Sequence, residues 1–310
     1  MIGDYTVQAI SANAFKGNTS LVSVLLPDTA VSIGESAFNG CTALKNVGFN
    51  DQLEVIGRYA FANCTALAEL DYPNSLTSVY AYAFQNCTGI ESLELPSNIT
   101  TLSSCAFQNC TTLKKIQYPV GWTVHQSRDD RVNDGVGYFS SPFAGCTALT
   151  SMTVPEGVTT LPYSAFKGMN FLKEISLPST LETVNGYVFQ GCSGLSELAL
   201  PSGLTTLEDN ALANCTGLTE ITIPSGITVL NNYVLAGCTG LTKVNLPSTL
   251  TTVYAYAMQG CTGITSLSLP SSITTISSLA FQNCASLETV NYPVGWTVHQ
   301  SRDDRVNDGV

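Results

Sequence analysis

The sequence predicts a repeat solenoid, a single curved stack of about twelve 23-residue coils with short parallel strands and no long helices. Three residue types support this prediction because they recur in one register. The apolar register consists of Phe15, Phe38, Phe61, Phe84, Phe107, Phe143, Phe166, Phe189, Leu212, Leu235, Met258 and Phe281. Prolines and cysteines keep the same spacing. Every step is 23 residues except that from Phe107 to Phe143, which is 36.

The consensus A-F-x-x-C-T-x-L-x-x-I-x-L-P-x-x-L-T-x-I explains each element of a coil in turn. A-F-x-x-C is too short for a helix and predicts a turn or a single 3₁₀ turn, with the phenylalanine in the core. L-x-x-I-x-L alternates apolar and polar residues as a half-buried strand does, and proline ends that strand. L-T-x-I predicts a second short strand. One coil cannot bury its apolar face alone, so the coils must stack.

The stretch AFQNCTGIESLELPSNITTLSSCAF, residues 83–107, resembles the BspA-type (Treponema-type) leucine-rich repeat. The resemblance covers nearly the whole chain and implies a right-handed leucine-rich-repeat rod. Members of this family are mostly surface or secreted proteins of host-associated bacteria. The resemblance therefore implies secretion or a cell-surface location, although the N-terminus shows no signal peptide, and adhesin-like binding of host or microbial proteins or glycans. The alternative is a structural spacer, or a rod that assembles head to tail and has no specific ligand.

Composition and charge exclude several classes of function. The net charge is −11 and no basic cluster is present, which argues against nucleic acid as a partner. No apolar run is long enough for membrane insertion. The two histidines, His125 and His299, lie in two copies of one segment, and no nucleophile elbow or phosphate-binding loop accompanies them. The sequence thus predicts a protein that is not an enzyme and needs no cofactor.

The cysteines favour packing over chemistry. Ten of the eleven follow the 23-residue register, but Asn18 and Met169 occupy that register in two coils. Methionine can fill space but cannot replace a thiolate ligand or half of a disulfide. Cys105 lies outside the register, and its counterpart is Leu279. We therefore predict buried free thiols without a metal.

Two other registers leave alternatives open. The tyrosines two residues before the phenylalanine position are either an aromatic contact strip or half-buried turn residues; they are Tyr59, Tyr82, Tyr187, Tyr233 and Tyr256. The outward strand position is small and polar, which predicts no tight interface but leaves a weak or multivalent one open. It holds Gly48, Asp71, Glu94, Gln117, Thr153, Ser176, Ala199, Thr222, Asn245, Ser268 and Asn291.

One nineteen-residue segment, YPVGWTVHQSRDDRVNDGV, occurs at residues 118–136 and again at 292–310. The interval between Pro119 and Phe143 carries 13 extra residues, which predicts an inserted loop at about 120–138 and a truncated second copy at 294–310. We expect a single solenoid over 1–310, cut from a longer array, and removal of residues 121–133 should restore the 23-residue spacing.

Loops on rigid scaffolds often contact partners, and Trp, Arg and Tyr are frequent anchors of interfaces. The predicted ligand-binding residues are Trp122, His125, Arg128, Asp129, Asp130, Arg131, Tyr138, Trp296, His299, Arg302, Asp303, Asp304 and Arg305. The alternatives are a loop held only by Asp–Arg pairs, and a Ca²⁺ site at Asp129, Asp130 and Asp134. The spacing of these aspartates is not that of an EF-hand loop.

Overall fold

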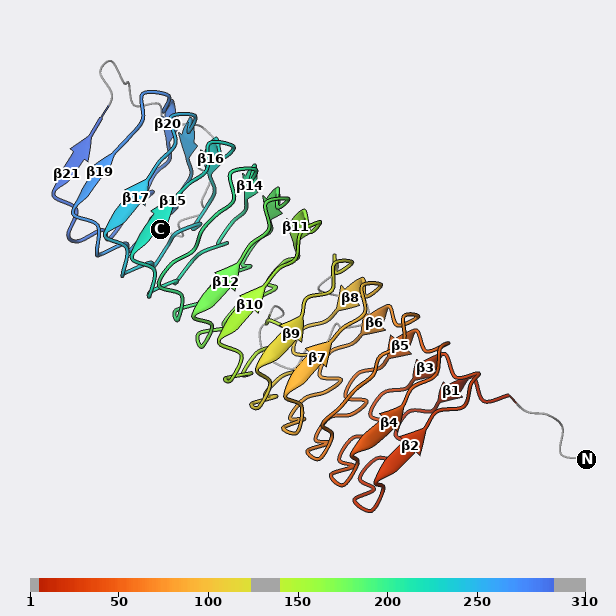
Figure 1. Cartoon of the computed structure of the whole chain (residues 1–310). Helices are drawn as coiled ribbons and strands as arrows, with labels where there is room; N and C mark the ends of the chain where they lie inside the picture. Colours follow the sequence, from red (N-terminus) through yellow and green to blue (C-terminus); the bar gives the residue numbers. More distant parts are fainter. Residues whose placement is uncertain (1–5, 124–139, 293–310) are drawn as a thin grey trace, which may run out of the picture. The chain divides into compact units, whose positions relative to one another are not determined.

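The structure, a computed structural model, describes residues 6–123 and 140–292 (Figure 1). The chain forms two compact units, Met1–Pro155 and Glu156–Val310. All 21 regular elements in the described residues are β-strands of two or three residues. This confirms the predicted solenoid with parallel strands and without long helices. No helix in the described part is long and apolar enough to cross a membrane. The single domain over 1–310 stays a prediction.

Unit 1 carries two rows of parallel strands, one from each strand motif of the repeat. The three-residue strands come from L-x-x-I-x-L and are β2 (Ser23–Leu25), β4 (Asn46–Gly48), β7 (Ser92–Glu94), β9 (Lys115–Gln117) and β10 (Ser151–Thr153). The two-residue strands are β1 (Ala9–Ile10), β3 (Ser32–Ile33), β5 (Val55–Ile56), β6 (Ser78–Val79) and β8 (Thr101–Leu102). The second row is one sheet in the order β1-β3-β5-β6-β8, and Ile33 pairs with Ile56 in a register offset by one repeat.

Unit 2 repeats the two rows. Its three-residue strands are β12 (Glu174–Ser176), β15 (Glu220–Thr222), β17 (Lys243–Asn245), β19 (Ser266–Ser268) and β21 (Thr289–Asn291). Its two-residue strands are β11 (Thr160–Leu161), β13 (Thr183–Val184), β14 (Thr206–Leu207), β16 (Val229–Leu230), β18 (Thr252–Val253) and β20 (Thr275–Ile276). Alternation in the sequence sets the faces, because the middle residue of most three-residue strands is buried between two exposed neighbours.

The A-F-x-x-C motif forms a turn held partly by the next coil. In the second coil the N–H groups of Ser36, Phe38 and Gly40 donate to carbonyls one coil ahead, at 2.7–2.8 Å. The alternate residues bond within the turn instead, as the Asn39 N–H does to the Ser36 carbonyl at 3.1 Å. Ser36 and Gly40 have φ of 55° and 78°. The position two residues after the phenylalanine is Gly or Asn in every coil, which suits a left-handed backbone.

The phenylalanine register lies in the core as predicted, except that Phe15 in the first coil is exposed and Phe281 in the last is half-buried. Phe38, Phe61, Phe84 and Phe107 are fully buried, and neighbouring rings along this column stack with centroids 5.0–5.2 Å apart. This distance is close to the strand spacing of about 4.8 Å, so the coils and the rings stack together. The column of rings also continues across the insertion, because the Phe107 and Phe143 rings stack with their centroids 5.9 Å apart.

The cysteine register confirms the prediction of free thiols. All eleven cysteines are free, and all but Cys284 are buried. Each register thiol donates to the backbone carbonyl at the phenylalanine position of the preceding coil, as Cys64 Sγ does to Phe38 at 3.2 Å and Cys192 Sγ to Phe166 at 3.1 Å. The register therefore supplies a hydrogen-bond donor as well as volume. Cys105 is buried beside Ala81 and Tyr82 and serves packing, as expected.

Trp122 corrects the predicted extent of the inserted loop. Its side chain is only 1% exposed and contacts Tyr118 and Phe143, with ring centroids 5.3 and 6.4 Å away. The Trp122 N–H donates to the Pro119 carbonyl at 3.1 Å, as the Ile99 N–H does to Pro96 one coil earlier at 3.2 Å. Trp122 thus occupies the core position of the second strand motif. The expectation that it protrudes as an interface anchor is wrong, because a large apolar ring in this register is buried by the stack.

Candidate functional site: an interrupted strand on the outward face

The row of three-residue strands in unit 1 is interrupted between β4 and β7. Residues 68–72, here called the unpaired segment, form no strand there (Figure 1). They make no hydrogen bond to any described residue, either as donors or as acceptors. In other coils the main chain at the repeat position of Ala68 is hydrogen-bonded. The Lys45 N–H donates to the Val22 carbonyl and the Lys114 N–H to the Glu91 carbonyl, both at 2.9 Å. The main-chain N–H and C=O groups of the unpaired segment therefore have no hydrogen-bond partner among the described residues.

Two aromatic rings lie at the inward position next to the segment. Phe49 and Tyr72 hold the inward position that is Leu, Ile or Val in most other coils. Their rings stack with centroids 5.6 Å apart, wider than the strand spacing of about 4.8 Å. Tyr72 also contacts Phe84 edge to face at 6.0 Å. The outward residues Ala68, Glu69 and Asp71 are poor strand formers, so they do little to oppose the separation.

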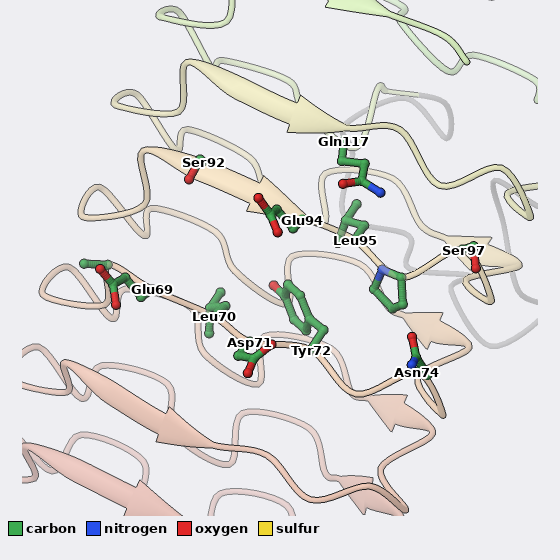
Figure 2. A pocket seen from close by; sticks show the side chains of 12 residues that line it. Glu69, Leu70, Asp71, Tyr72, Asn74, Ser92, Glu94, Leu95, Ser97 and Gln117 are labelled. Atoms are coloured by element: carbon green, nitrogen blue, oxygen red, sulfur yellow. The ribbon is translucent and has the colours of Figure 1, made fainter. Parts of the chain in front are cut away.

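A depression of about 580 Å³ lies over the unpaired segment. Its lining includes three carboxylates, Glu69, Asp71 and Glu94, and Figure 2 shows the first two on the unpaired segment and Glu94 on neighbouring β7. The floor includes Leu70, which is half-exposed, unlike the buried residues at its position in β7 and β9. No lysine or arginine is among the described residues that line the depression. It is therefore a negatively charged hollow with a partly apolar floor.

Tyr72 belongs to the core rather than to the mouth of the depression. It is 8% exposed, and its hydroxyl is buried and has no hydrogen-bond partner in the described structure. Burial raises the pKa of Tyr72 well above its usual value, and the nearby thiols of Cys87 and Cys110 raise it further. The hydroxyl is therefore protonated and does not add a fourth negative charge to the hollow.

The row of three-residue strands in unit 2 is also interrupted, and this interruption is here called the gap in unit 2, but its residues form more hydrogen bonds than the unpaired segment does. Residues 196–200 also form no strand, yet the Thr219 N–H still donates to the Ser196 carbonyl at 3.2 Å. The neighbouring Glu220 carboxylate accepts hydrogen bonds from the Lys243 ammonium group at 2.5 Å and from the Asn245 amide at 2.8 Å. Hydrogen bonds from these two side chains lower the pKa of Glu220. The gap in unit 2 thus offers fewer free groups than the unpaired segment.

No simple sequence signal separates the two gaps from the paired strands. Their strand positions read AELD at residues 68–71 and SELA at residues 196–199, but the paired strands β12 and β15 carry the same Glu before the central apolar residue, and β7 carries Glu after it. The sequence predicted Asp71 and Glu94 as outward-facing, and both are exposed, but it gave no sign that the main chain between β4 and β7 was unpaired.

Most of the predicted loop site lies outside the described residues. This applies to His125, Arg128, Asp129, Asp130, Arg131 and Tyr138 in the first copy, and to Trp296, His299, Arg302, Asp303, Asp304 and Arg305 in the second. The alternative Ca²⁺ site, which includes Asp134, also falls there. Of the predicted site residues in the first copy, only Trp122 is described, and its side chain lies in the core.

The tyrosine register lies in turns, where Tyr82 is buried and the other four tyrosines are half-buried, which agrees with the second of the two readings. Tyr59 and Tyr82 stack at 4.9 Å, and Tyr233 and Tyr256 at 4.7 Å, each pair nearly parallel. All four have φ between 51° and 59°. The Arg58 guanidinium lies 5.5 Å from the centre of the Tyr59 ring. Each stacked pair covers one face of both rings, which leaves less aromatic surface for a ligand.

Comparison with known proteins places this geometry in a family. A family model described as the BspA type leucine-rich repeat region matches residues 8–128, 139–242 and 210–302, in 6 copies. A leucine-rich repeat protein from Bacteroides ovatus has a similar structure, with a TM-score of 0.69, 24% identity, and coverage of 97% of this chain and 82% of that chain.

Two further solved structures share the fold. A leucine-rich cell surface protein from Faecalibacterium prausnitzii is 26% identical, with a TM-score of 0.52 over 98% of this chain and 86% of that one. The pneumococcal vaccine antigen PcpA is 18% identical, with a TM-score of 0.53 over 93% of this chain and 85% of its own. No curated protein matches the sequence significantly.

Proposed function

Because the chain belongs to the BspA type leucine-rich repeat family, we propose that it is a recognition protein of the bacterial cell surface, adhesin-like and not an enzyme. Its partners would be host or microbial surface proteins or glycans. The observation that carries the proposal is the acidic depression over the unpaired segment, an open hollow on the outward strand face of unit 1. Leucine-rich repeats are scaffolds that present such faces, while the partner depends on the residues each scaffold displays.

Two further observations support this function. The similar protein from Faecalibacterium prausnitzii is described as a cell surface protein. Within the described residues, the thiols are held as donors to backbone carbonyls and burial raises the pKa of Cys64 to about 12. Such thiols are poor nucleophiles, because the thiolate is the reactive form. A hollow that binds without transforming its partner fits these features better than an active site does.

The inserted loop stays part of the proposal as a second contact region. Its charged residues, Arg128 to Arg131, begin six residues after the buried Trp122 in sequence. Partner contacts from the loop and from the depression would each be weak and would add through avidity.

Binding to immobilised extracellular-matrix proteins and to a glycan array tests the function. We expect saturable binding of the full chain to at least one of them. Ser92→Trp should weaken it, because Ser92 lines the depression and a large side chain would fill the hollow. Ser266→Trp is the matched control, since Ser266 starts β19 at the same repeat position in unit 2 and is equally exposed. The proposal fails if neither panel binds the chain.

The alternative function, a spacer or self-assembling rod, predicts different results. A spacer binds nothing on either panel and sediments as a monomer at all concentrations. A rod that assembles head to tail gives a sedimentation coefficient that rises steadily with concentration, because head-to-tail contacts do not close. Sedimentation velocity on the same preparation therefore separates these alternatives from each other and from a binder.

A further inference from the structure

We propose that the depression over the unpaired segment binds an extended basic segment of the partner, one that presents arginine or lysine side chains. This inference rests on the proposed recognition function and names the chemistry that its outward face selects. It depends on four features of the hollow: its charge, its free main-chain groups, the spread of its carboxylates and its apolar floor.

The charge of the hollow selects a cation. Glu69, Asp71 and Glu94 are exposed carboxylates at its wall, and no lysine or arginine is among its described lining residues. None of the three carboxylates forms an ion pair within the described residues. Of the two lysines in the neighbouring coil, Lys114 pairs with Glu91 at 2.9 Å and Lys115 does not line the depression. A guanidinium or ammonium group would supply the missing counter-charge. An anionic ligand would be repelled.

The unpaired main chain adds acceptors that an ordinary strand would not have. In a paired strand the carbonyl groups are used by neighbouring strands, but residues 68–72 make no hydrogen bond within the described structure. Arginine carries five N–H donors and lysine three, and neither carries an acceptor. A further peptide strand does not fit between the coils, whose rings stack at 5.1–5.6 Å, so the donors that reach these carbonyl groups are the side chains of the ligand.

The spread of the carboxylates favours a peptide over a metal ion. No three acidic, cysteine or histidine side chains among the described residues converge closely enough to hold one metal ion. A divalent cation needs its oxygen ligands at about 2.0–2.6 Å from a single point. A chain with several positive charges can instead meet each carboxylate separately.

The floor and the size of the hollow fit long basic side chains. Leu70 and Pro96 are half-exposed in the lining, whereas Leu95 is buried. Lysine and arginine lay their methylene stems on apolar surface while their charged ends reach polar groups. The volume of about 580 Å³ lies within the range of ligand pockets, about 300–1,000 Å³. A neutral glycan is a poorer fit, because the one aromatic lining residue, Tyr72, is buried.

Titration of a fluorescein-labelled hexa-arginine peptide with the full chain tests this inference. At an ionic strength of about 0.15 M, where nonspecific attraction is largely screened, we expect saturable binding and none with hexa-glutamate. The triple variant Glu69→Gln, Asp71→Asn and Glu94→Gln removes the charge while keeping the shape. Its Kd for hexa-arginine should rise by about tenfold or more.

The control variant carries Glu54→Gln, Glu182→Gln and Glu288→Gln, three exposed carboxylates that do not line the depression. It has the same net charge as the test variant, and its Kd should change by less than about threefold, as expected for distant surface charges. Circular dichroism and urea unfolding should show both variants folded, since all six carboxylates are exposed.

Three results would overturn the inference. Equal losses in the two variants would mean that hexa-arginine responds only to net charge. Absence of saturable binding to the wild-type chain would mean that the hollow does not select a basic segment. Saturable Ca²⁺ binding that the triple variant alone loses would identify a metal site instead. If the chain still binds a matrix protein or glycan in any of these cases, the recognition function stands and only the basic ligand is lost.

Discussion

Single residues in this protein serve the coil and its neighbour at once. The Phe166 ring is fully buried and stacks on Phe189 at 5.5 Å, while its backbone carbonyl accepts the Cys192 thiol at 3.1 Å. The side chain therefore fills the core and the main chain connects consecutive coils. A repeat in which each position has two such partners tolerates few substitutions inside the stack and many outside it.

Truncation of the phenylalanine position should be costly. Phe166→Ala removes a fully buried ring and should lower the free energy of unfolding by about 3–5 kcal/mol, because it leaves a cavity between coils. Thr153→Ala, on the exposed outward face of β10, should cost less than about 0.5 kcal/mol. Urea unfolding of both variants measures the difference. Similar losses would contradict the assignment of inward and outward faces.

The thiol column makes stability fall at alkaline pH. Burial raises the pKa of Cys64 and of Cys192 to about 12, while a thiol in the unfolded chain ionises near about 8.5. A pKa raised by folding means that the unfolded state loses its protons first as the pH rises. The stabilisation is thus fully present below about pH 8.5 and is lost toward pH 12, with a slope of up to about 1.4 kcal/mol per pH unit for each thiol.

Urea midpoints between about pH 7 and about pH 10 check this sign. The midpoint should fall steadily over that interval, and the double variant Cys64→Ala and Cys192→Ala should show a smaller fall because it has two fewer titrating thiols. A urea midpoint that is constant, or that rises with pH, would show that ionisation of these thiols does not lower the stability at alkaline pH.

At the scale of the element, one coil lacks the strand that its repeat pattern predicts. Every coil has the L-x-x-I-x-L pattern, and most form a strand there, yet residues 68–72 do not. The apolar spacing alone predicts a strand at this place. The Phe49–Tyr72 stack and the weak strand formers Glu69 and Asp71 distinguish this coil, although Tyr118 next to β9 and Glu174 in β12 are each compatible with a strand.

Restoring strand-forming residues should stabilise this element. Glu69→Thr with Asp71→Thr replaces two poor strand formers by a good one and removes two like charges, so the free energy of unfolding should rise by about 0.5–1 kcal/mol. Glu174→Thr on β12, which already forms a strand, is the control and should change it by less. Thermal unfolding measures both. Destabilisation by the double variant would show that another interaction holds the segment out of the sheet.

At the scale of the whole molecule, the repeat period carried most of the prediction. The solenoid, the buried phenylalanines and the free thiols all follow from a register that only stacked coils can satisfy. The depression was not predictable in the same way, because coils with the same residue types at these positions, Tyr118 next to β9 and Glu174 in β12, do form strands. Trp122 was misplaced for a related reason, since its residue type suggested an interface while its register position, equivalent to Ile99, required burial.

The corrected position of Trp122 changes which deletion the stack should tolerate. Removal of residues 125–137 takes out 13 residues, restores the 23-residue spacing from Phe107 to the next phenylalanine, and keeps Trp122 in its place. We expect this variant to unfold at a urea concentration close to that of the wild type. Removal of residues 121–133 also restores the spacing but deletes the buried Trp122, so it should lose about 3–5 kcal/mol, as large core truncations do.

Comparison of the two deletions separates a structural role of the loop from a binding role. If residues 125–137 contact the partner, their removal should weaken binding on the matrix and glycan panels while the urea midpoint stays unchanged. Unfolding of the 125–137 variant would instead assign these residues to the core. Equal stability of the two variants would contradict the burial of Trp122, because removing a side chain that is 1% exposed cannot be neutral unless another residue replaces it between Tyr118 and Phe143.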